Sequence, residues 1–179
     1  MRSEGQNPVL GVIRARRSVR AYLEKEVPQQ MEQALFEAGR LAPNAWDRQS
    51  FVLCKLGPRA RRALVALTAR HLGGVEADHN FFGAPLVVLF LDRRENFERR
   101  ADAGCVLENM MLAAQSFGLG SVWVDQFATL EDAPDLAELL ENYGFDRQMV
   151  ICGAVAFGWP DPAEEILPRP LRSEIITLE

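Results

Sequence analysis

Three arginines and a serine lie within five residues near the start of the chain, in the segment Arg16-Arg17-Ser18-Val19-Arg20-Ala21-Tyr22. A guanidinium group offers paired donors that match the oxygens of a phosphate, and a serine hydroxyl can bond the same group. Because the chain carries a formal net charge of −5, this local positive cluster favours a small anionic ligand over a polyanion. The alternative is a solvated basic helix end, where cations interact favourably with the helix dipole.

Three further segments have residues suited to a ligand site. The first is a polar turn, residues 41–49, in which Asn44 and Gln49 can each donate and accept hydrogen bonds. The second, residues 118–126, holds a Gly-x-Gly pair that lets the main chain approach a flat ligand or a phosphate. That pair alone is weak evidence, and it lacks the third glycine and the strand–helix order of a dinucleotide-binding fingerprint. The third, residues 167–172, adds two arginines or is simply a solvated tail.

The composition indicates one soluble domain over residues 1–179. Hydrophobic residues make up 48% of the chain and charged residues 25%, which is ordinary for a globular protein. The acidic balance disfavours nucleic acid as a partner, and the longest apolar run, residues 85–91, is far shorter than the roughly 20 residues that span a bilayer. Residues 1–7 have no apolar signal core, so we expect a cytoplasmic protein that neither enters a membrane nor is exported.

The cysteines and histidines argue against a metal centre. Cys54, Cys105 and Cys152 each lie in an apolar segment, which predicts three buried free thiols in a reducing compartment. With only two histidines and no cysteine pair at ligand spacing, we expect no metal site. The acidic residues between 92 and 102 alternate with arginines, a pattern that indicates ion pairs.

Hydrophobic spacing predicts a mixture of helices and strands. Apolar residues three and four positions apart predict helices at residues 8–15, 28–41, 59–72, 96–117 and 131–141, the last of them exposed. Apolar runs predict strands at residues 50–56, 85–91, 121–124 and 149–157. The helix at 96–117 is apolar nearly all round from Ala103 onward, which indicates packing on both sides, in a core or against a second subunit.

In chain order, five motifs resemble the nitroreductase family of flavin enzymes. They are residues 16–22, Ala42-Pro43-Asn44 with Gln49, Phe82-Gly83-Ala84-Pro85, Ala101-Asp102 continuing through residues 109–114, and residues 118–123. The resemblance implies an α+β sandwich with a central, mostly antiparallel sheet flanked by helices. It also implies an intertwined homodimer with one FMN in each of two sites at the subunit interface. The tail, residues 161–179, would wrap the partner subunit.

The resemblance implies a role for individual residues. Those expected to hold the FMN phosphate, ribityl chain and pyrimidine edge are Arg16, Arg17, Ser18 and Arg20. Those expected to reach the flavin from the other subunit are Pro43, Asn44 and Ala45, with Gln49 in the same motif. Those expected along the isoalloxazine ring are Gly120, Ser121, Val124, Asp125 and Gln126, while Arg169 would close on the phosphate.

We therefore expect an FMN-dependent oxidoreductase that passes hydride from NADH or NADPH through FMN to a nitroaromatic, quinone or similar small acceptor. Reduced flavin carries negative charge near its N1–O2 edge, which Arg20 would stabilise, and no side chain need act as a nucleophile or acid. Asp47 stands where the family usually has a neutral donor, and Asp125-Gln126 also depart from the commoner pattern. These departures leave the acceptor open, together with a second class of function, a flavin- or small-ligand-binding dimer without efficient turnover.

Overall fold

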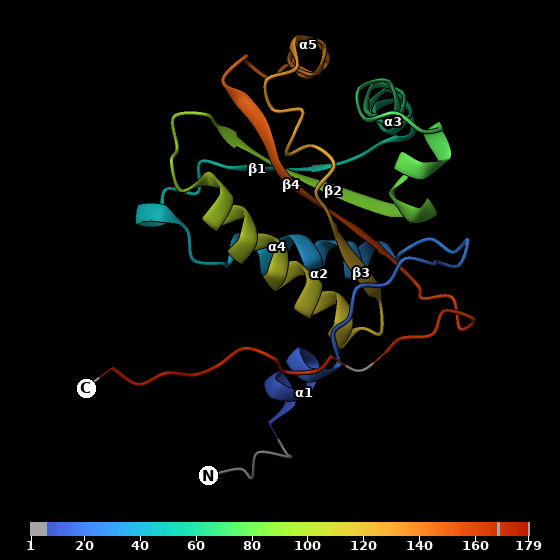
Figure 1. Ribbon diagram of the computed structural model, residues 1–179, viewed down its shortest axis with the longest axis vertical. Coiled ribbons are helices and arrows are strands. Elements are labelled where there is room, and N and C mark those ends of the chain that lie inside the picture. The colour runs from blue at the N-terminus through green and yellow to red at the C-terminus, as the bar shows by residue number, and fades with distance from the viewer. Residues whose placement is uncertain (1–6, 168, 179) are drawn as a thin grey trace.

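The computed structural model describes residues 7–167 and 169–178, so the expectations for residues 1–6 and for Pro168 lie outside it. The strands of this part form one antiparallel sheet in the order β1-β2-β4-β3 (Figure 1). Their bounds are Val52–Lys55 for β1, Leu86–Arg93 for β2, Gly120–Val124 for β3 and Met149–Gly158 for β4. The central strands β2 and β4 are buried along nearly their whole length, as expected for strands that are apolar on both faces.

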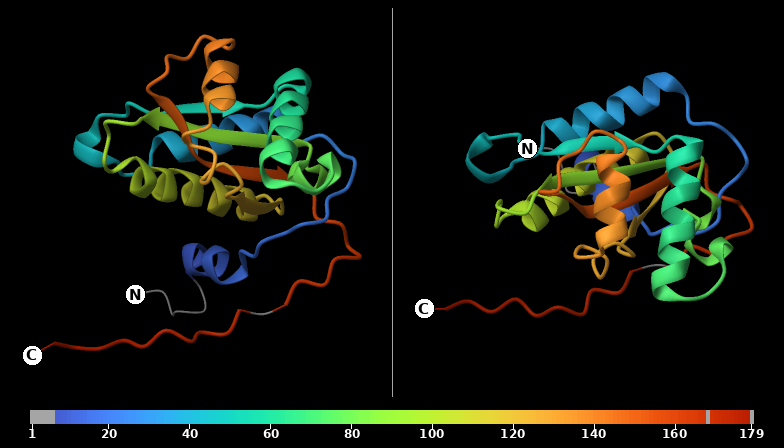
Figure 2. Two further views of the ribbon diagram at one scale, coloured as in Figure 1. Left: turned by 45° about the horizontal axis from the view of Figure 1, so that its top comes forward. Right: turned by 90° about the horizontal axis from the view of Figure 1, so that it is seen from above.

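Helices cover both faces of the sheet. The bounds are Pro8–Ala15 for α1, Gln29–Arg40 for α2, Pro58–Leu72 for α3, Arg99–Ser116 for α4 and Pro134–Glu141 for α5. Short 3-10 turns occur at Ala45–Asp47 (η2), Glu76–His79 (η3) and Phe81–Gly83 (η4). Helices α2 and α4 lie on one face and α3 and α5 on the other, while α1 lies beyond α4 (Figures 1 and 2). This three-layer arrangement confirms the predicted α+β class and the antiparallel sheet flanked by helices.

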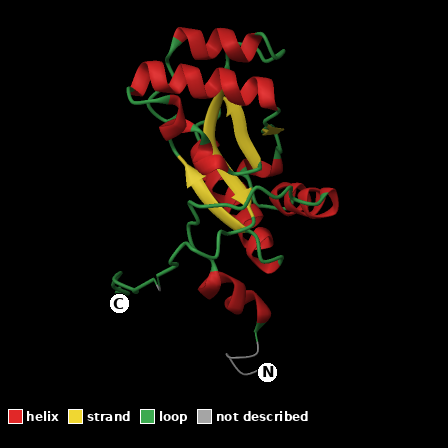
Figure 3. Ribbon diagram, turned by 90° about the vertical axis from the view of Figure 1, so that its right-hand side faces the viewer, coloured by secondary structure: helices red, strands yellow, loops and turns green. Residues whose placement is uncertain are grey.

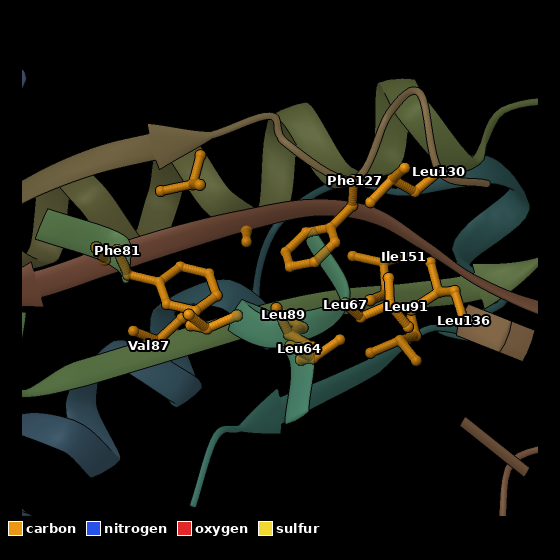
Figure 4. Close-up of a cluster of buried hydrophobic side chains, with 14 of the residues drawn as sticks. Leu64, Leu67, Phe81, Val87, Leu89, Leu91, Phe127, Leu130, Leu136 and Ile151 are labelled. Atoms are coloured by element: carbon orange, nitrogen blue, oxygen red, sulfur yellow. The ribbon is translucent and has the colours of Figure 1, made fainter. Parts of the chain in front are cut away.

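Two hydrophobic clusters hold the layers together, one on each face of the sheet. Under α3 and α5, the cluster includes Leu64, Leu136 and Phe127 (Figure 4). Under α2 and α4, the cluster includes Leu35 and Met110, both fully buried. Because a strand points alternate side chains to opposite faces, β2 contributes residues to both clusters.

The predicted elements occur in the predicted order, with three corrections to the details. Helix α5 begins at Pro134 rather than at residue 131, because the Glu131 carboxylate is instead bonded to the arginines of α4 and a proline is favoured at a first helical position. The helix is also not simply exposed, since Leu136 and Leu140 are buried. Cys152 is buried as predicted, Cys54 is partly buried, and the prediction for Cys105 is wrong. Cys105 lies exposed on α4.

The tail runs away from the layered body. Figure 3 shows it as a loop that leaves the end of β4 on the same side of the body as α1. Its apolar residues are uncovered in this chain, with Ile175 98% and Leu178 93% exposed. Within the described residues, no helix combines the length and apolar character needed to cross a bilayer.

Candidate functional site

The arginine segment lies along the edge strand of the sheet. Ser18 forms a parallel bridge with Ser121 of β3, and the Val19 amide donates to the Ser121 carbonyl at 3.0 Å. Four residues later the Leu23 amide donates to the Trp159 carbonyl, just beyond β4, at 2.9 Å. The structure thus brings together two of the predicted site segments, residues 16–22 and 118–126, which are about a hundred residues apart in the sequence.

Gly120 is required by the close approach of these two segments. A Cβ atom at this position would lie 2.8 Å from three carbon atoms of the buried Val19 side chain. Real Cβ contacts of that length essentially do not occur, so any larger residue would force the arginine segment or β3 to move. The glycine therefore serves packing between two segments of the chain, a role that the Gly-x-Gly pattern does not reveal.

Tyr22 links the same segment to β4 through its hydroxyl. Its hydroxyl donates to the Val19 carbonyl at 2.7 Å and to the Ala156 carbonyl at 3.3 Å. Burial raises the pKa of Tyr22 far above its ordinary value, and the nearby Glu164 carboxylate raises it further. The hydroxyl therefore stays protonated and continues to donate at any physiological pH.

The three guanidinium groups are placed differently. The Nε atom of Arg16 lies 3.2 Å from the Glu108 carboxylate, on α4, and only 11% of the Arg16 side chain is exposed. The Arg17 guanidinium donates to main-chain carbonyls, at 2.7 Å to those of Arg14 and Arg16. Arg20 is exposed and its guanidinium stands 6.0 Å over the ring of Phe82. Main-chain carbonyls therefore already use part of the donor capacity of Arg17, whereas the charge of Arg20 stands at the surface.

The start of the tail is fastened to the arginine segment. The Glu164 carboxylate accepts from the Arg20 amide at 2.8 Å and from the Ala21 amide at 3.1 Å. The Leu167 carbonyl accepts from the Nε atom of Arg17 at 3.2 Å. Arg169 follows two residues later and is exposed. Glu164 and Glu108 were not predicted as parts of the site, because an acidic residue in a tail or on a helix gives no signal of its distant partner.

The polar turn at Pro43–Gln49 is anchored and strained. Its Ala45 amide donates to the buried Asp102 carboxylate at 2.8 Å, and its Gln49 amide donates to the side-chain oxygen of Asn44 at 2.9 Å. Trp46, Asp47 and Gln49 have φ angles of 52°, 53° and 46°, a region that side chains other than glycine rarely occupy. Such backbone persists only where the surrounding contacts hold it, and it is common at functional sites.

This turn and the pairing of Ser18 with Ser121 lie at opposite ends of α4. Asp102, which holds Ala45, is in the first turn of the helix, whereas the residues leading to Ser121 follow its last turn. From Asp102 to Ser116 the helix rises about 21 Å. Most of α4 therefore separates Pro43, Asn44, Ala45 and Gln49 from the Ser18–Ser121 pairing, although Arg16 reaches Glu108 in the middle of the helix.

The end of β3 carries the last predicted group. Val124 is buried, whereas Asp125 is exposed and accepts from the Trp123 indole at 3.3 Å. The Gln126 side-chain amide donates to the His79 carbonyl at 3.4 Å. The segment at residues 79–84 therefore borders both Gln126 and, through Phe82, Arg20. In the described part of the chain, no group of three or more His, Cys, Asp or Glu residues is arranged to hold a metal ion.

Known proteins resemble this chain over most of its length. The model of the nitroreductase family matches residues 13–159. The crystal structure of a nitroreductase with bound FMN from Bacteroides fragilis superposes with a TM-score of 0.86 at 26% identity, covering 97% of this chain and 99% of that one. A protein from Archaeoglobus fulgidus, provisionally named NADH dehydrogenase/NAD(P)H nitroreductase, is 27% identical over 154 residues, 84% of each chain. An NADPH-flavin oxidoreductase from Vibrio harveyi is 24% identical over 91% of this chain and 70% of its own. The sequence and the fold of this chain together show that it belongs to the nitroreductase family.

Proposed function

We propose that this nitroreductase-family protein is an FMN-dependent oxidoreductase that takes hydride from NADH or NADPH and reduces a nitroaromatic, a quinone or a similar small acceptor. The observation that carries the proposal is the pairing of Ser18 with Ser121, which sets the arginine segment against β3. Similarity to the FMN-bound Bacteroides fragilis structure and to the Vibrio harveyi NADPH-flavin oxidoreductase supports the same cofactor and reductant class. The proposal takes residues 1–179 as a single domain.

The donors of the arginine segment suit an anionic cofactor. Arg16 is held by Glu108 through its Nε atom, so its terminal nitrogens remain for the phosphate oxygens. The proposed partners of the phosphate, ribityl chain and pyrimidine edge are Arg16, Arg17, Ser18 and Arg20, with Arg169 closing on the phosphate. The proposed partners of the ring are Gly120, Ser121, Val124, Asp125 and Gln126.

The chemistry that FMN supplies when bound is hydride acceptance from a reduced nicotinamide and delivery of the electrons to an acceptor. The chain's own residues would bind the cofactor, orient it and tune its electrostatic surroundings. Arg20, exposed and positively charged, would stabilise negative charge at the N1–O2 edge of the ring electrostatically. In the proposed mechanism no side chain acts as a nucleophile or as a dedicated acid.

We further propose that the working molecule is an intertwined homodimer. Pro43, Asn44, Ala45 and Gln49 lie by the first turn of α4, whereas Ser18 pairs with Ser121 beyond its last turn, so they would serve the site of the partner subunit. The exposed apolar side chains of the tail supply a surface that a second copy would cover. Deleting residues 168–179 should weaken both the dimer and FMN binding. An unchanged sedimentation profile would contradict the wrapping tail.

An anaerobic absorption spectrum tests the function. The purified protein should absorb at flavin wavelengths, and the absorbance should bleach when NADH or NADPH is added and return with a nitroaromatic or a quinone. Yellow protein that no nicotinamide bleaches would favour the second candidate, a flavin-binding dimer without efficient turnover. The observation that supports this second candidate is the pair of exposed carboxylates, Asp47 and Asp125, either of which would oppose negative charge on a nearby flavin. Colourless protein that takes up no added FMN would contradict both.

A further inference from the structure

The turn at residues 80–84, between α3 and β2, has an unusual backbone. Phe81 and Phe82 have φ angles of 52° and 58°, and Gly83 follows at 71°. Two consecutive non-glycine residues in the left-handed region cost free energy, and such a turn persists only where other contacts hold it. Phe82 belongs to one of the motifs that resemble the nitroreductase family, but the resemblance gives neither aromatic ring a role.

Arg61 of α3 holds both ends of this turn. Its Nε atom donates to the Asn80 side-chain oxygen and its Nη2 atom to the Asn80 carbonyl, each at 2.8 Å. Its Nη1 atom donates to the Ala84 carbonyl at the other end. The same guanidinium stands 5.6 Å from the centre of the Phe81 ring. A lysine could not replace it, because an ammonium lacks the planar fork that reaches three acceptors at once.

The held turn buries one of its two phenylalanines and exposes the other. Phe81 is 2% exposed and packs beside Phe127, with the ring centres 6.1 Å apart (Figure 4). Phe82 is 43% exposed, and its ring lies 6.0 Å from the guanidinium carbon of Arg20. Since Phe81 is fixed in the core and Arg61 fixes the ends, the position of Phe82 follows from the shape of the turn.

We propose that Arg61 is a positioning residue that holds the Phe82 ring against Arg20, and that this ring strengthens the hold of Arg20 on negative charge at the flavin edge. The inference rests on the proposed function and adds two residues to its site. An aromatic face attracts a guanidinium and holds it in place. The ring also displaces water from one side of the cation, and a charge pair attracts more strongly where water is excluded. Both effects favour the reduced, negatively charged flavin over the oxidised one.

The test compares variants of the turn in the complete protein. Phe82→Leu removes the ring, Arg61→Lys removes the fork, and Phe82→Tyr keeps a ring. Arg59→Lys is the matched control, because Arg59 is an exposed arginine two residues earlier on the same helix. The readouts are the dissociation constant of FMN, from fluorescence quenching, and the two-electron midpoint potential, from an anaerobic titration against a reference dye.

Phe82→Leu and Arg61→Lys should each weaken the binding of reduced FMN about fivefold more than that of oxidised FMN. This ratio makes the midpoint potential about 20 mV more negative. Phe82→Tyr and Arg59→Lys should leave the potential at the wild-type value. An unchanged potential in Phe82→Leu overturns the inference, even if Arg61→Lys lowers the melting temperature, and so does an equal effect of Arg59→Lys. Wild-type protein that binds FMN and bleaches leaves the proposed function standing in either case, whereas wild-type protein that binds no FMN overturns both.

Discussion

Replacing Gly120 by alanine would place a methyl group where Val19 already lies. The new Cβ would stand 2.8 Å from three carbons of Val19, whereas carbon atoms normally approach to about 3.5–4.0 Å. Val19 is 3% exposed and paired through its amide with Ser121, so the segment must shift by about 1 Å or the strand must bend. Overpacking of a buried site costs about 1–3 kcal/mol. At 2 kcal/mol, the melting temperature of a chain of this size falls by about 4–8 °C.

Urea denaturation and FMN titration measure the two consequences. Gly120→Ala should lower the free energy of unfolding by about 2 kcal/mol. It should also weaken FMN binding about tenfold, if 1.4 kcal/mol of that binding is lost with the displaced arginines. Gly104→Ala is the control, since a Cβ at Gly104 of α4 meets nothing within 4 Å in this chain. That alanine should stabilise the protein by about 0.4–1 kcal/mol, because it reduces the freedom of the unfolded chain.

A double-mutant cycle decides whether the contact between the new Cβ and Val19 causes the loss of stability. Val19→Ala removes two of the three crowding carbons, so the two substitutions together should cost less than the sum of their separate effects. Strict additivity of the two would refute the reasoning. So would a Gly120→Ala protein with wild-type stability and wild-type FMN affinity.

Three further outcomes are expected. Arg16→Ala should cost about 1.5–3 kcal/mol of FMN binding through the loss of a charge-assisted bond, and cofactor content equal to wild type would refute the phosphate assignment. Burial alone would raise the pKa of Glu131, but hydrogen bonds from Arg99 and Arg100 outweigh it and hold the pKa below its ordinary value. The stability that Glu131 contributes is therefore present at neutral pH and lost as the pH falls below about 4; in acid-unfolding curves, Glu131→Gln should remove that loss, and an unchanged acid limb would count against the pairing. Burial raises the pKa of Cys152 to about 11, so in a thiol-labelling time course this residue should react only on unfolding; fast labelling of native Cys152 would contradict its burial.

Local patterns were enough to predict the elements. The apolar run at Leu86–Leu91 became a buried central strand, and the three- and four-residue spacing before Pro43 became α2. These features depend on neighbours within one or two turns of backbone, so they are readable from a short stretch of chain. The start of α5 was missed for a long-range reason, since Glu131 bonds to Arg99 and Arg100 of α4 rather than joining the helix.

The candidate site also has features that the sequence predicted and features that only the tertiary structure determined. Residue types and spacing predicted the arginine segment, the polar turn and the glycine pair as candidate binding elements, because donor chemistry and backbone freedom belong to the residues themselves. Only the tertiary structure decided that Ser18 pairs with Ser121, that Arg16 meets Glu108 and that Arg61 fixes the ends of the turn before β2. It also decided that Asp102 holds the polar turn at the first turn of α4, away from the Ser18–Ser121 pairing beyond its last turn. Such pairings join residues far apart in the sequence, and the path of the chain through three dimensions, rather than any local pattern, selects them.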